Sequence, residues 1–339
     1  MASPMNGGDG THSYSKNSTL QRCGLSAVED AIKEAVMQNV ETDKLLCGST
    51  RFAIADLGCS VGPNTFHAVE TIIEAVQHKS STNNLEFQVL FNDQIGNDFN
   101  TLFASLPQER NYFAAAVAGS FYGRLFPSSS IHIAYSSGAL HWLSKLPEGL
   151  KVKDSPAWNA GRIHYSGASD AVVKAYAEQL EEDLENFLRC RAQEIVGGGM
   201  IVILVGGVSH ANVQHRSTVL FTFVEAILID MVKEGVLAQE VVDSFNIPIV
   251  YACINDVRRI VEKNGCFEIV KMEMVEPVDI ATAETNVVMH LRAAMEGTLI
   301  DHFGEEITEQ VLVRAMRLPT HMMVDAAHGG GIFALLKRK

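Results

Sequence analysis

The sequence predicts an α/β protein built on a doubly wound, mostly parallel seven-stranded sheet with an antiparallel edge strand and a helical cap. Short apolar runs at 52–57 and 87–91 alternate with stretches of helical periodicity, as in a parallel sheet that helices cover on both faces. Two further strand-like runs, at 266–274 and 331–337, come after long helical insertions. Late strands of this kind are typical of an antiparallel pair added to one side of a parallel sheet.

The other elements follow the same pattern along the chain. Residues 25–40 predict an amphipathic helix, and 218–235 predict a helix apolar enough to belong to a cap. Residues 145–165 predict a long irregular region, and the glycines at 197–199 are expected to end the helix before them. Further strands are expected at 131–136 and 200–205, and further helices at 66–76, 97–106, 171–196, 255–263, 287–302 and 306–317.

We find neither an internal repeat nor a linker that would separate independent domains. The chain is therefore expected to be a single unit over 1–339. Within this unit we expect a Rossmann-like core at about 25–210 plus 245–275 and 325–339, and a helical cap mainly at 211–244 and 280–324.

The composition limits the class of protein. Of the 339 residues, 47% are hydrophobic, enough for one large core or a core with a cap. The 27 basic and 40 acidic residues give a net charge of −13, which disfavours nucleic acid or an anionic membrane as a partner. The six cysteines include no C-x-x-C pair, so we expect reduced thiols rather than disulfides or a zinc site. The polar N-terminal residues and the lack of a long apolar run predict a soluble, cytoplasmic protein.

The chain is organised around residues 51–64, RFAIADLGCSVGPN, which combine a buried strand, a glycine turn and the start of a helix. This is the opening of a nucleotide-binding crevice in a doubly wound sheet. The glycine spacing is G-x-x-x-G rather than the G-x-G-x-x-G of dinucleotide loops, and Asp56 stands just before the turn. A carboxylate there repels phosphate and suits an ammonium or sulfonium group. S-adenosylmethionine therefore fits better than NAD, although a purely structural glycine turn is the alternative.

Polar and aromatic residues follow the ends of the later predicted strands. Asp93 ends the second strand, where an acid reaches the ribose hydroxyls of a bound nucleoside; a simple turn aspartate is the alternative. Ser120 and Phe121 lie in a loop, where they can bind adenine or merely pack against their neighbours. His141 and Trp142 fall just past another strand end, the side on which open α/β sheets bind their ligands.

Motifs in order along nearly the whole chain resemble the plant SABATH methyltransferases, the salicylate, benzoate, jasmonate and caffeine-synthase family. The matching motifs are M-N-G-G, S-Y-x-K-N-S, Q-R, A-D-L-G-C-S-x-G-P-N-T, F-N-D, N-D-F-N-T-L-F, G-S-F-Y-G-R-L-F-P, L-H-W-L-S-K-L-P, R-A-Q-E-I-V-x-G-G and D-S-F-N-I-P. Further stretches, W-N-x-G-R-I-H-Y-S-G among them, are most similar to the members that methylate loganic acid. The resemblance implies a class I methyltransferase fold and a homodimer.

The resemblance also implies roles for individual residues. Gln21 and Trp142 would hold the carboxylate of the acceptor, with His141 beside them. The residues implied around S-adenosylmethionine are Tyr14, Ser18, Asp56, Cys59, Asn64, Asp93, Gln94, Ser120 and Phe121. The residues that match a magnesium-associated cluster are Asn159, Asp243, Phe245 (through its backbone) and Asn246, and we expect a structural role for that ion.

Three departures from the family pattern affect these expectations. Gly138 stands where relatives usually have a tyrosine, which removes a ring from the acceptor pocket and predicts a bulkier acceptor than salicylate. Gln94 replaces a residue that is often hydrophobic and changes the adenosine edge. The chain is also shorter than many relatives around 277–285, so contacts of the cap can differ.

The expected reaction is methyl transfer from S-adenosylmethionine to a small-molecule carboxylic acid, which gives a methyl ester. Carboxyl groups titrate near about 4, so the acceptor is ionised at neutral pH and no general base is needed. The protein must instead align the carboxylate oxygen with the methyl group in a closed pocket. The alternatives are N-methylation of a xanthine, a catalytically silent ligand-binding protein and, from the fold alone, a nicotinamide dehydrogenase.

Overall fold

The structure is a computed structural model that describes residues 3–80, 84–210, 213–215, 217–276, 287–317 and 330–339. One mixed sheet runs through it in the order β3-β2-β1-β4-β5-β8-β7, and a short strand, β6, pairs with β5. The strands are β1 (Arg51–Leu57), β2 (Glu86–Asp93), β3 (Tyr112–Ala118), β4 (Ile131–Ser137), β5 (Ile195–Val208), β6 (Ala252–Cys253), β7 (Phe267–Val275) and β8 (Gly331–Arg338).

The helices are α1 (Tyr14–Asn17), α2 (Thr19–Asn39), α3 (Thr42–Leu46), α4 (Pro63–Lys79), α5 (Phe99–Ala104), the 3₁₀ turn η1 (Glu148–Lys151), α6 (Asp170–Glu194), α7 (Thr218–Lys233), α8 (Gln239–Asp243), α9 (Ile254–Asn264) and α10 (Val287–Ala315). Helix α10 is broken at Gly304, whose φ is 78°, so it corresponds to the two helices expected at its place. Among the described helices, none has the length and apolar character needed to cross a membrane.

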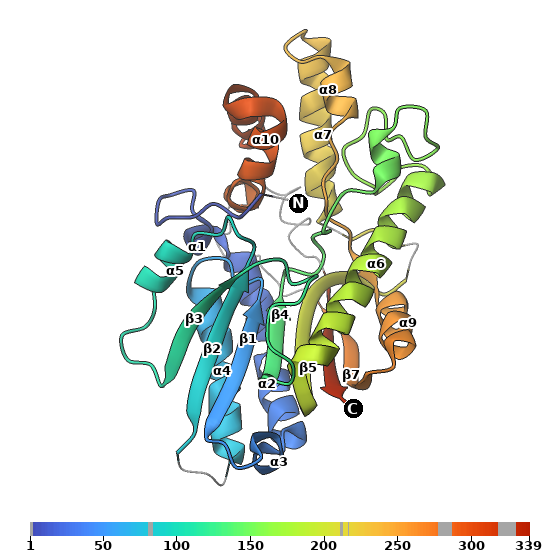
Figure 1. The fold of residues 1–339 in the computed structure, drawn as a ribbon. Helices are drawn as coiled ribbons and strands as arrows, with labels where there is room; N and C mark the ends of the chain where they lie inside the picture. The colour runs from blue at the N-terminus through green and yellow to red at the C-terminus, as the bar shows by residue number, and fades with distance from the viewer. Residues whose placement is uncertain (1–2, 81–83, 211–212, 216, 277–286, 318–329) are drawn as a thin grey trace.

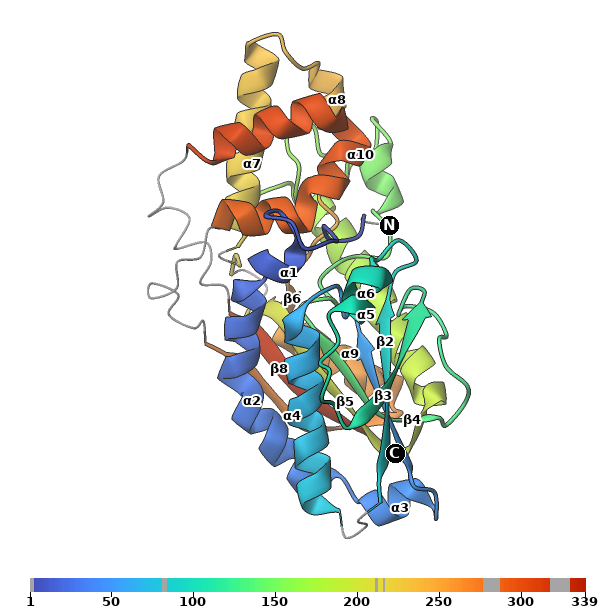
Figure 2. The same cartoon turned by 90° about the vertical axis from the view of Figure 1, so that its left-hand side faces the viewer.

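The sheet is mostly parallel, as predicted. Strand β1 runs parallel to β2 and β4, β2 to β3, and β4 to β5, whereas β8 runs antiparallel to both β5 and β7. Successive residues of β1 face opposite sides: Phe52 and Ile54 pack with α2 and α4, and Ala53 and Leu57 pack with α6 and α9. Figures 1 and 2 show these helix pairs on the two faces, which confirms the doubly wound fold.

The structure differs from the prediction at three strands. The antiparallel strand β8 lies between β5 and β7, because residues 332–336 are buried on both faces while the half-exposed β7 suits the edge. The described part of the chain has eight strands rather than the seven predicted. The short strand β6 has only two residues, too few to give a sequence pattern. Residues 112–118, YFAAAVA, gave no strand prediction because alanine dominates them, yet they form the edge strand β3.

Two helix boundaries also differ. Helix α2 begins at Thr19 rather than near residue 25, so Gln21 lies within its first turn rather than before it. The glycines at 197–199 lie inside β5, and α6 ends earlier, at Glu194. The length departure around 277–285 falls outside the described residues.

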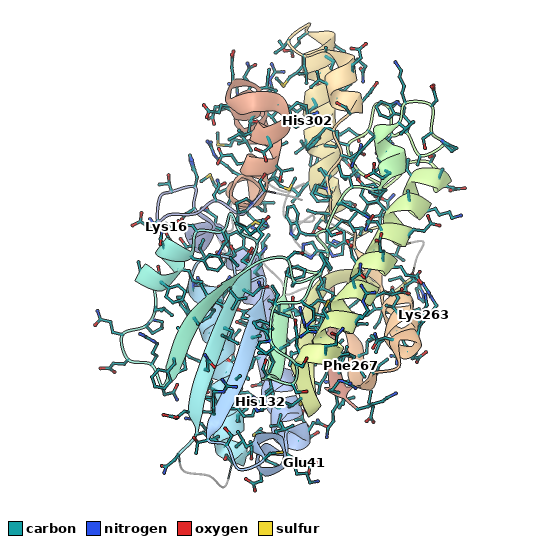
Figure 3. The ribbon with its side chains drawn as sticks, in the orientation of Figure 1. Lys16, Glu41, His132, Lys263, Phe267 and His302 are labelled. Carbon is teal, nitrogen blue, oxygen red and sulfur yellow. The ribbon has the colours of Figure 1, made fainter. Side chains whose placement is uncertain are left out.

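A layer of helices lies beyond the carboxyl ends of the central strands. Helices α7, α8 and α10 share a core of their own that includes Leu228, Met231, Leu299 and Val311. Figure 1 shows them at the opposite end of the molecule from α3, which precedes β1. Figure 3 labels one side chain at each end: His132 lies at the amino end of β4, and His302 lies in the cap. The strands therefore end beneath the helical cap.

Candidate active site

Three adjoining pockets lie where the strand ends meet the cap, and Tyr14 lines all of them. The turn pocket is lined by the turn after β1 together with Asp56 and Tyr135. The loop pocket is lined by Asp93 and by the loop after β3. The cap pocket is lined by residues from α2, from the segment after β4 and from α7 and α10; those used below are Gln21, Gly138, His141, Trp142, His215, Phe221, Tyr251, Glu276 and His290.

The turn after β1 requires glycine at two positions. Gly58 has a φ of 88°, and a Cβ on it would collide with the side chain of Ala139 after β4. Gly62 has a φ of 116°, and a Cβ there would lie 2.8 Å from the Cα of Ser15. Both dihedral angles favour glycine. The G-x-x-x-G pattern thus packs the turn against α1 and against the segment after β4, and a ligand can approach the bare backbone between them.

Asp93 joins the ends of β1 and β2. Its Oδ2 accepts a hydrogen bond from the backbone N–H of Ser60 at 2.7 Å, and its Oδ1 accepts one from Gln94 at 2.8 Å. Burial raises the pKa of Asp93 to about 6, against the opposing effect of these two hydrogen bonds. The carboxylate therefore keeps free lone pairs in a largely buried pocket, where hydroxyl donors of a ligand would stabilise its charged form.

Asp56 is the second buried carboxylate of the site. It accepts a hydrogen bond from the hydroxyl of Thr65, and burial raises its pKa to about 7, with Asp93 adding to the rise. The same burial, together with the two carboxylates, raises the pKa of the Cys59 thiol well above its usual value. Cys59 is therefore a neutral packing group rather than a nucleophile. An acidic pocket of this kind favours a cationic ligand.

Tyr14, Ser18 and Asn64 connect α1, α2 and α4. The side-chain amide of Asn64 donates to both the backbone oxygen and the hydroxyl of Ser18, each at 3.0 Å. Asn64 lines the turn pocket, whereas Ser18 lines none of the three pockets and contributes by holding Asn64. Tyr14 is a neutral phenol, because burial first and Asp93 second raise its pKa.

The loop after β3 carries Ser120 and Phe121, which line the loop pocket with Gln94. The side-chain amide of Asn92 donates to the backbone oxygens of Val117 and Gly119, at 2.8 and 2.9 Å. This fixes the point at which the loop leaves the strand.

A buried ion pair at the end of α6 fixes the rest of that loop. Arg191 donates to the backbone oxygens of Phe121 and Gly123, both at 2.9 Å, and its Nε donates to Glu194 at 2.7 Å. Glu194 in turn accepts from the backbone N–H of Leu125 at 2.6 Å. Both charged side chains are buried, so each depends on the other and on the loop to compensate its charge. The loop is therefore pre-organised before any ligand binds.

Gln21 and His290 meet in the cap pocket, from α2 and α10. The amide Nε2 of Gln21 lies 3.5 Å from Nε2 of His290, and the Nδ1 of that ring lies 3.1 Å from the backbone oxygen of Asn17. The Oε1 atom of Gln21 is buried and has no hydrogen-bond partner among the described residues. Gln21 therefore has unused hydrogen-bonding capacity beside the cavity.

Trp142 and His141 follow β4, as predicted, and both line the cap pocket. The backbone oxygen of Trp142 accepts from the hydroxyl of Tyr122 at 2.7 Å, and its strand-like pairing with Ile249 ties it to the segment before β6. Burial lowers the pKa of His141 to about 3, with smaller effects from His215 and His290. A ring so weakly basic is neutral at pH 7 and is a poor general base.

Neutral rings line part of the cap pocket. His215 and Tyr251 stack with their centroids 3.6 Å apart, and His141 also stacks with Tyr251, at 5.6 Å. Burial lowers the pKa of His215 to about 4, so this ring is uncharged at pH 7. Phe221 from α7 adds apolar surface, and Glu276 adds an acidic group at the wall. The pocket thus offers hydrogen-bonding groups on a largely neutral surface.

Gly138 lies between the loop pocket and the cap pocket and lines both. A Cβ built on it would come within 3.6 Å of Cγ of Gln21, an ordinary van der Waals distance. Its φ is 63°, however, which side chains other than glycine adopt only with strain. The position therefore has room for a side chain but a backbone that resists one.

The four residues expected at a magnesium site lie near one another but do not fit such a site well. The amide of Asn159 donates to Oδ1 of Asn246 at 2.8 Å, so one of the two lone pairs of that oxygen is engaged. The single carboxylate, Asp243, accepts from the backbone N–H of Gly161 at 2.7 Å. Phe245 is buried in the cap core. No group of three or more His, Cys, Asp or Glu residues with metal-binding geometry occurs within the described ranges. Magnesium prefers several oxygen ligands in octahedral geometry.

The segment over residues 3–8 crosses the site from the cap to the sheet. Asn6 hydrogen-bonds through its backbone N–H to Ala293 at 2.9 Å and through its side chain to Glu296, both on α10. The N–H of Gly8 donates to Asp98 at 2.9 Å, just before α5. Met5, directly before the first of these anchors, lines both the cap pocket and the loop pocket. The segment therefore closes the site between cap and core.

Several residues of this site had no assigned role in the sequence. Asn92 lies within F-N-D, and Arg191 and Glu194 lie within R-A-Q-E, so these motifs carried a signal that went unused. His215 and His290 had no local signal, since their proximity to Gln21 and His141 comes only from the packing of the cap.

Comparison with known proteins agrees with this arrangement. The family model for the SAM dependent carboxyl methyltransferases matches residues 1–339. The chain is 41% identical to loganic acid O-methyltransferase of Catharanthus roseus, over 100% of this chain and 95% of that protein. It is 41% identical to farnesoic acid carboxyl-O-methyltransferase of Arabidopsis thaliana, over 80% of this chain and 78% of that protein. A solved structure described as loganic acid methyltransferase with SAH superposes with a TM-score of 0.93, at 41% identity and 99% coverage of both chains. The chain therefore belongs to the family of S-adenosylmethionine-dependent carboxyl methyltransferases.

Proposed function

We propose that this enzyme methylates the single carboxylate of a hydroxylated plant acid, with loganic acid as the first candidate. The observation that carries the proposal is the cap pocket, in which Gln21 and Trp142 adjoin a neutral wall of histidine and tyrosine rings. Gly138 leaves the space that a tyrosine side chain would fill in many relatives, which suits an acceptor larger than salicylate. The 41% identity to a loganic acid O-methyltransferase supports the same choice.

The turn pocket and the loop pocket fit S-adenosylmethionine. The hydroxyl of Ser60 is buried and has no hydrogen-bond partner in the part of the chain that the structure describes. The two buried carboxylates of Asp56 and Asp93 lack cationic neighbours among the groups that shift their pKa values. A ligand with an ammonium group and ribose hydroxyls would satisfy all three. When bound, S-adenosylmethionine supplies an electrophilic methyl group.

Each predicted cofactor residue then has a specific task. Asp93 anchors the ribose, Asp56 favours the cationic amino-acid portion, and Phe121 packs against the adenine. The remaining residues, which bound or shape these pockets, are Tyr14, Ser18, Cys59, Asn64, Gln94 and Ser120.

The chain's own contribution to the reaction is placement. Gln21 and Trp142 hold the acceptor carboxylate with neutral donors, which leaves its oxygen nucleophilic. The weakly basic His141 remains neutral and shapes the pocket, since an acid that is already ionised has no proton to remove. Alignment in a closed pocket supplies the main rate advantage, because it removes the entropy cost of bringing the two reactants together.

A panel assay tests the proposal. The purified enzyme is incubated with radiolabelled methyl donor and single acids: loganic acid, farnesoic acid, gibberellic acid, salicylic acid, benzoic acid and jasmonic acid. Formation of the methyl ester is scored for each. We expect the highest kcat/KM with loganic acid, and a clear preference for a small aromatic acid would overturn the acceptor assignment.

Xanthine N-methylation is the second candidate, because the chain is 40% identical to paraxanthine methyltransferase 2 of Arabidopsis thaliana, over 89% of this chain and 88% of that protein. A xanthine requires both donors and acceptors in its pocket, and Oε1 of Gln21 is an available acceptor. Paraxanthine in the same panel decides between the two. A catalytically silent protein would form no product but would still bind S-adenosylmethionine by calorimetric titration.

The proposal assigns no reaction step to magnesium, because the donor set around Asp243 fits the ion poorly. A structural magnesium ion, the homodimer, the cytoplasmic location and the division into core and cap at the stated boundaries remain predictions. Size-exclusion chromatography with light scattering tests the homodimer.

A further inference from the structure

His290 lies in the cap pocket without a role in the reaction described above. It comes from the first turn of α10, and its ring is within contact distance of groups on both sides. On one side Nδ1 lies 3.1 Å from the backbone oxygen of Asn17, which precedes α2. On the other side Nε2 lies 3.5 Å from Nε2 of Gln21, inside α2. The ring therefore bridges the cap to the part of α2 that carries the carboxylate-binding amide.

The contact with Asn17 determines the tautomer of His290. A backbone carbonyl oxygen can only accept, so Nδ1 must carry the hydrogen that is donated to it. Burial lowers the pKa of His290, which keeps the ring neutral and leaves a lone pair on Nε2. That lone pair faces Gln21 and can accept only from an N–H. The amino group of Gln21, rather than its Oε1, must therefore face His290.

The state of Oε1 agrees with this orientation. Oε1 is buried without a partner among the described residues, so no protein donor draws the amide into the opposite orientation. With one N–H given to His290, the amide retains a second N–H for an acceptor oxygen. A flipped amide would place its oxygen against the Nε2 lone pair of the ring, and the two acceptors would repel.

We propose that His290 is a positioning residue that fixes the orientation of the Gln21 amide and so keeps an N–H available to the acceptor's carboxylate. The proposal rests on the assignment of Gln21 to the carboxylate in the proposed function. His290 itself does not contact the acceptor carboxylate in this arrangement. Its contribution passes through Gln21, and this distinguishes it from a residue that simply lines the pocket.

A double-mutant cycle tests the proposal with loganic acid, or with the panel acid of highest kcat/KM. The variants are Gln21→Ala, His290→Leu and the double variant, and KM for the acid and the dissociation constant for S-adenosylmethionine are measured for each. We expect His290→Leu to raise KM for the acid about fivefold to tenfold, as loss of one hydrogen bond would. We expect His290→Leu to have no further effect in the Gln21→Ala background, because the group through which it acts is gone. The affinity for S-adenosylmethionine is expected to stay the same.

Two controls separate positioning from folding. His290→Gln can still accept from Gln21 through its own amide oxygen and should restore most of the acid's KM. His302→Leu removes another histidine of α10, whose ring bonds the backbone oxygen of Val241 at 2.9 Å in the cap and is labelled in Figure 3. It should leave KM unchanged. If His290→Leu does not fold, His290→Phe keeps the ring volume without either nitrogen and replaces it in the cycle.

Each outcome is decisive. Independent losses from Gln21→Ala and His290→Leu that multiply in the double variant would overturn the proposal, because His290 would then act on the acid or on the fold directly. An unchanged KM in His290→Leu and His290→Phe would also overturn it. An unchanged KM in Gln21→Ala would instead refute the assignment of Gln21 in the proposed function, and the positioning role would fall with it.

Discussion

The turn pocket and the cap pocket are built in opposite ways, although they share Tyr14 and Gln21. The turn pocket is made mostly by one contiguous stretch, residues 56–65. The backbone path of this stretch is determined by its glycines and by the buried carboxylate of Asp93. The cap pocket is assembled from α2, the segment after β4, α7 and α10, and its histidines are neutral. We infer that the first pocket depends on a few strong polar contacts, and that the second depends on shape and on several weak ones.

The largest expected effect is at Asp93, which lines the loop pocket and holds the turn after β1 through the backbone N–H of Ser60. Asp93→Ala removes the carboxylate that would bind the ribose, and we expect binding of S-adenosylmethionine to weaken by about 2 kcal/mol or more. Calorimetric titration measures this, and Asp93→Asn should recover part of the loss because it retains one acceptor oxygen. An unchanged affinity in Asp93→Ala would refute the ribose assignment.

Gly138 tests whether shape governs the cap pocket. Gly138→Tyr is expected to depress kcat/KM for the native acid by about 1–3 kcal/mol through steric overlap, and to affect small aromatic acids less. The positive φ gives a competing reason for loss, so Gly138→Asn is the matched control: asparagine tolerates the left-handed conformation better than other residues. If Gly138→Asn and Gly138→Tyr lose equally on both acid classes, the glycine serves the backbone and the wide-pocket explanation is wrong.

Gln21 tests whether the two pockets are separable. Gln21→Ala should raise KM for the acid about tenfold, since a hydrogen bond to a charged group is lost. The dissociation constant for S-adenosylmethionine should remain at the wild-type value. Because Gln21 also borders the turn pocket, a collapse of cofactor affinity would instead assign it to the other site.

The stability of the ligand-free protein should depend on pH through two buried carboxylates, Asp56 in the turn pocket and Asp93 in the loop pocket. Burial raises the folded-state pKa values of Asp56 and Asp93 to about 7 and about 6, above their unfolded value of 3.8. The contribution of such groups is fully present below about pH 4 and is lost as pH rises through the folded pKa values. The double variant Asp56→Asn, Asp93→Asn does not lose this contribution. We therefore expect its melting temperature, relative to that of the wild type, to rise from pH 4 to pH 7. A constant difference across that range would contradict the buried-carboxylate description.

Metal removal gives the smallest expected effect. Dialysis against EDTA, followed by addition of MgCl₂, should leave the melting temperature and the kcat unchanged. The reason is that the four residues supply only one carboxylate, and that both Asp243 and Asn246 accept hydrogen bonds from the protein. A rise in melting temperature on addition of magnesium, abolished by Asp243→Asn, would restore the metal site expected from the family resemblance.

The difference between the pockets also explains what the sequence could predict. The fold class and the turn residues are local: apolar runs, glycine spacing and acids at strand ends lie within a few positions of one another. The position of β8 between β5 and β7 depends on burial by elements more than fifty residues away, and the two-residue β6 has no pattern at all. His290 reaches Gln21 across 269 positions, a contact that no local pattern encodes. Family motifs supplied the role of Gln21 but not that of its neighbour.

The segment over residues 3–8 has a consequence for biosynthesis. Asn6 and its partner Glu296 are 290 positions apart, so this segment leaves the ribosome long before the helix on which it docks. Until α10 has emerged, the buried residues of α7 cannot pack against it. The cap pocket that Met5 lines is then still incomplete. Nascent chains stalled before residue 287 should therefore bind chaperones through the unfinished cap, while the central strands β1 to β5 are already complete.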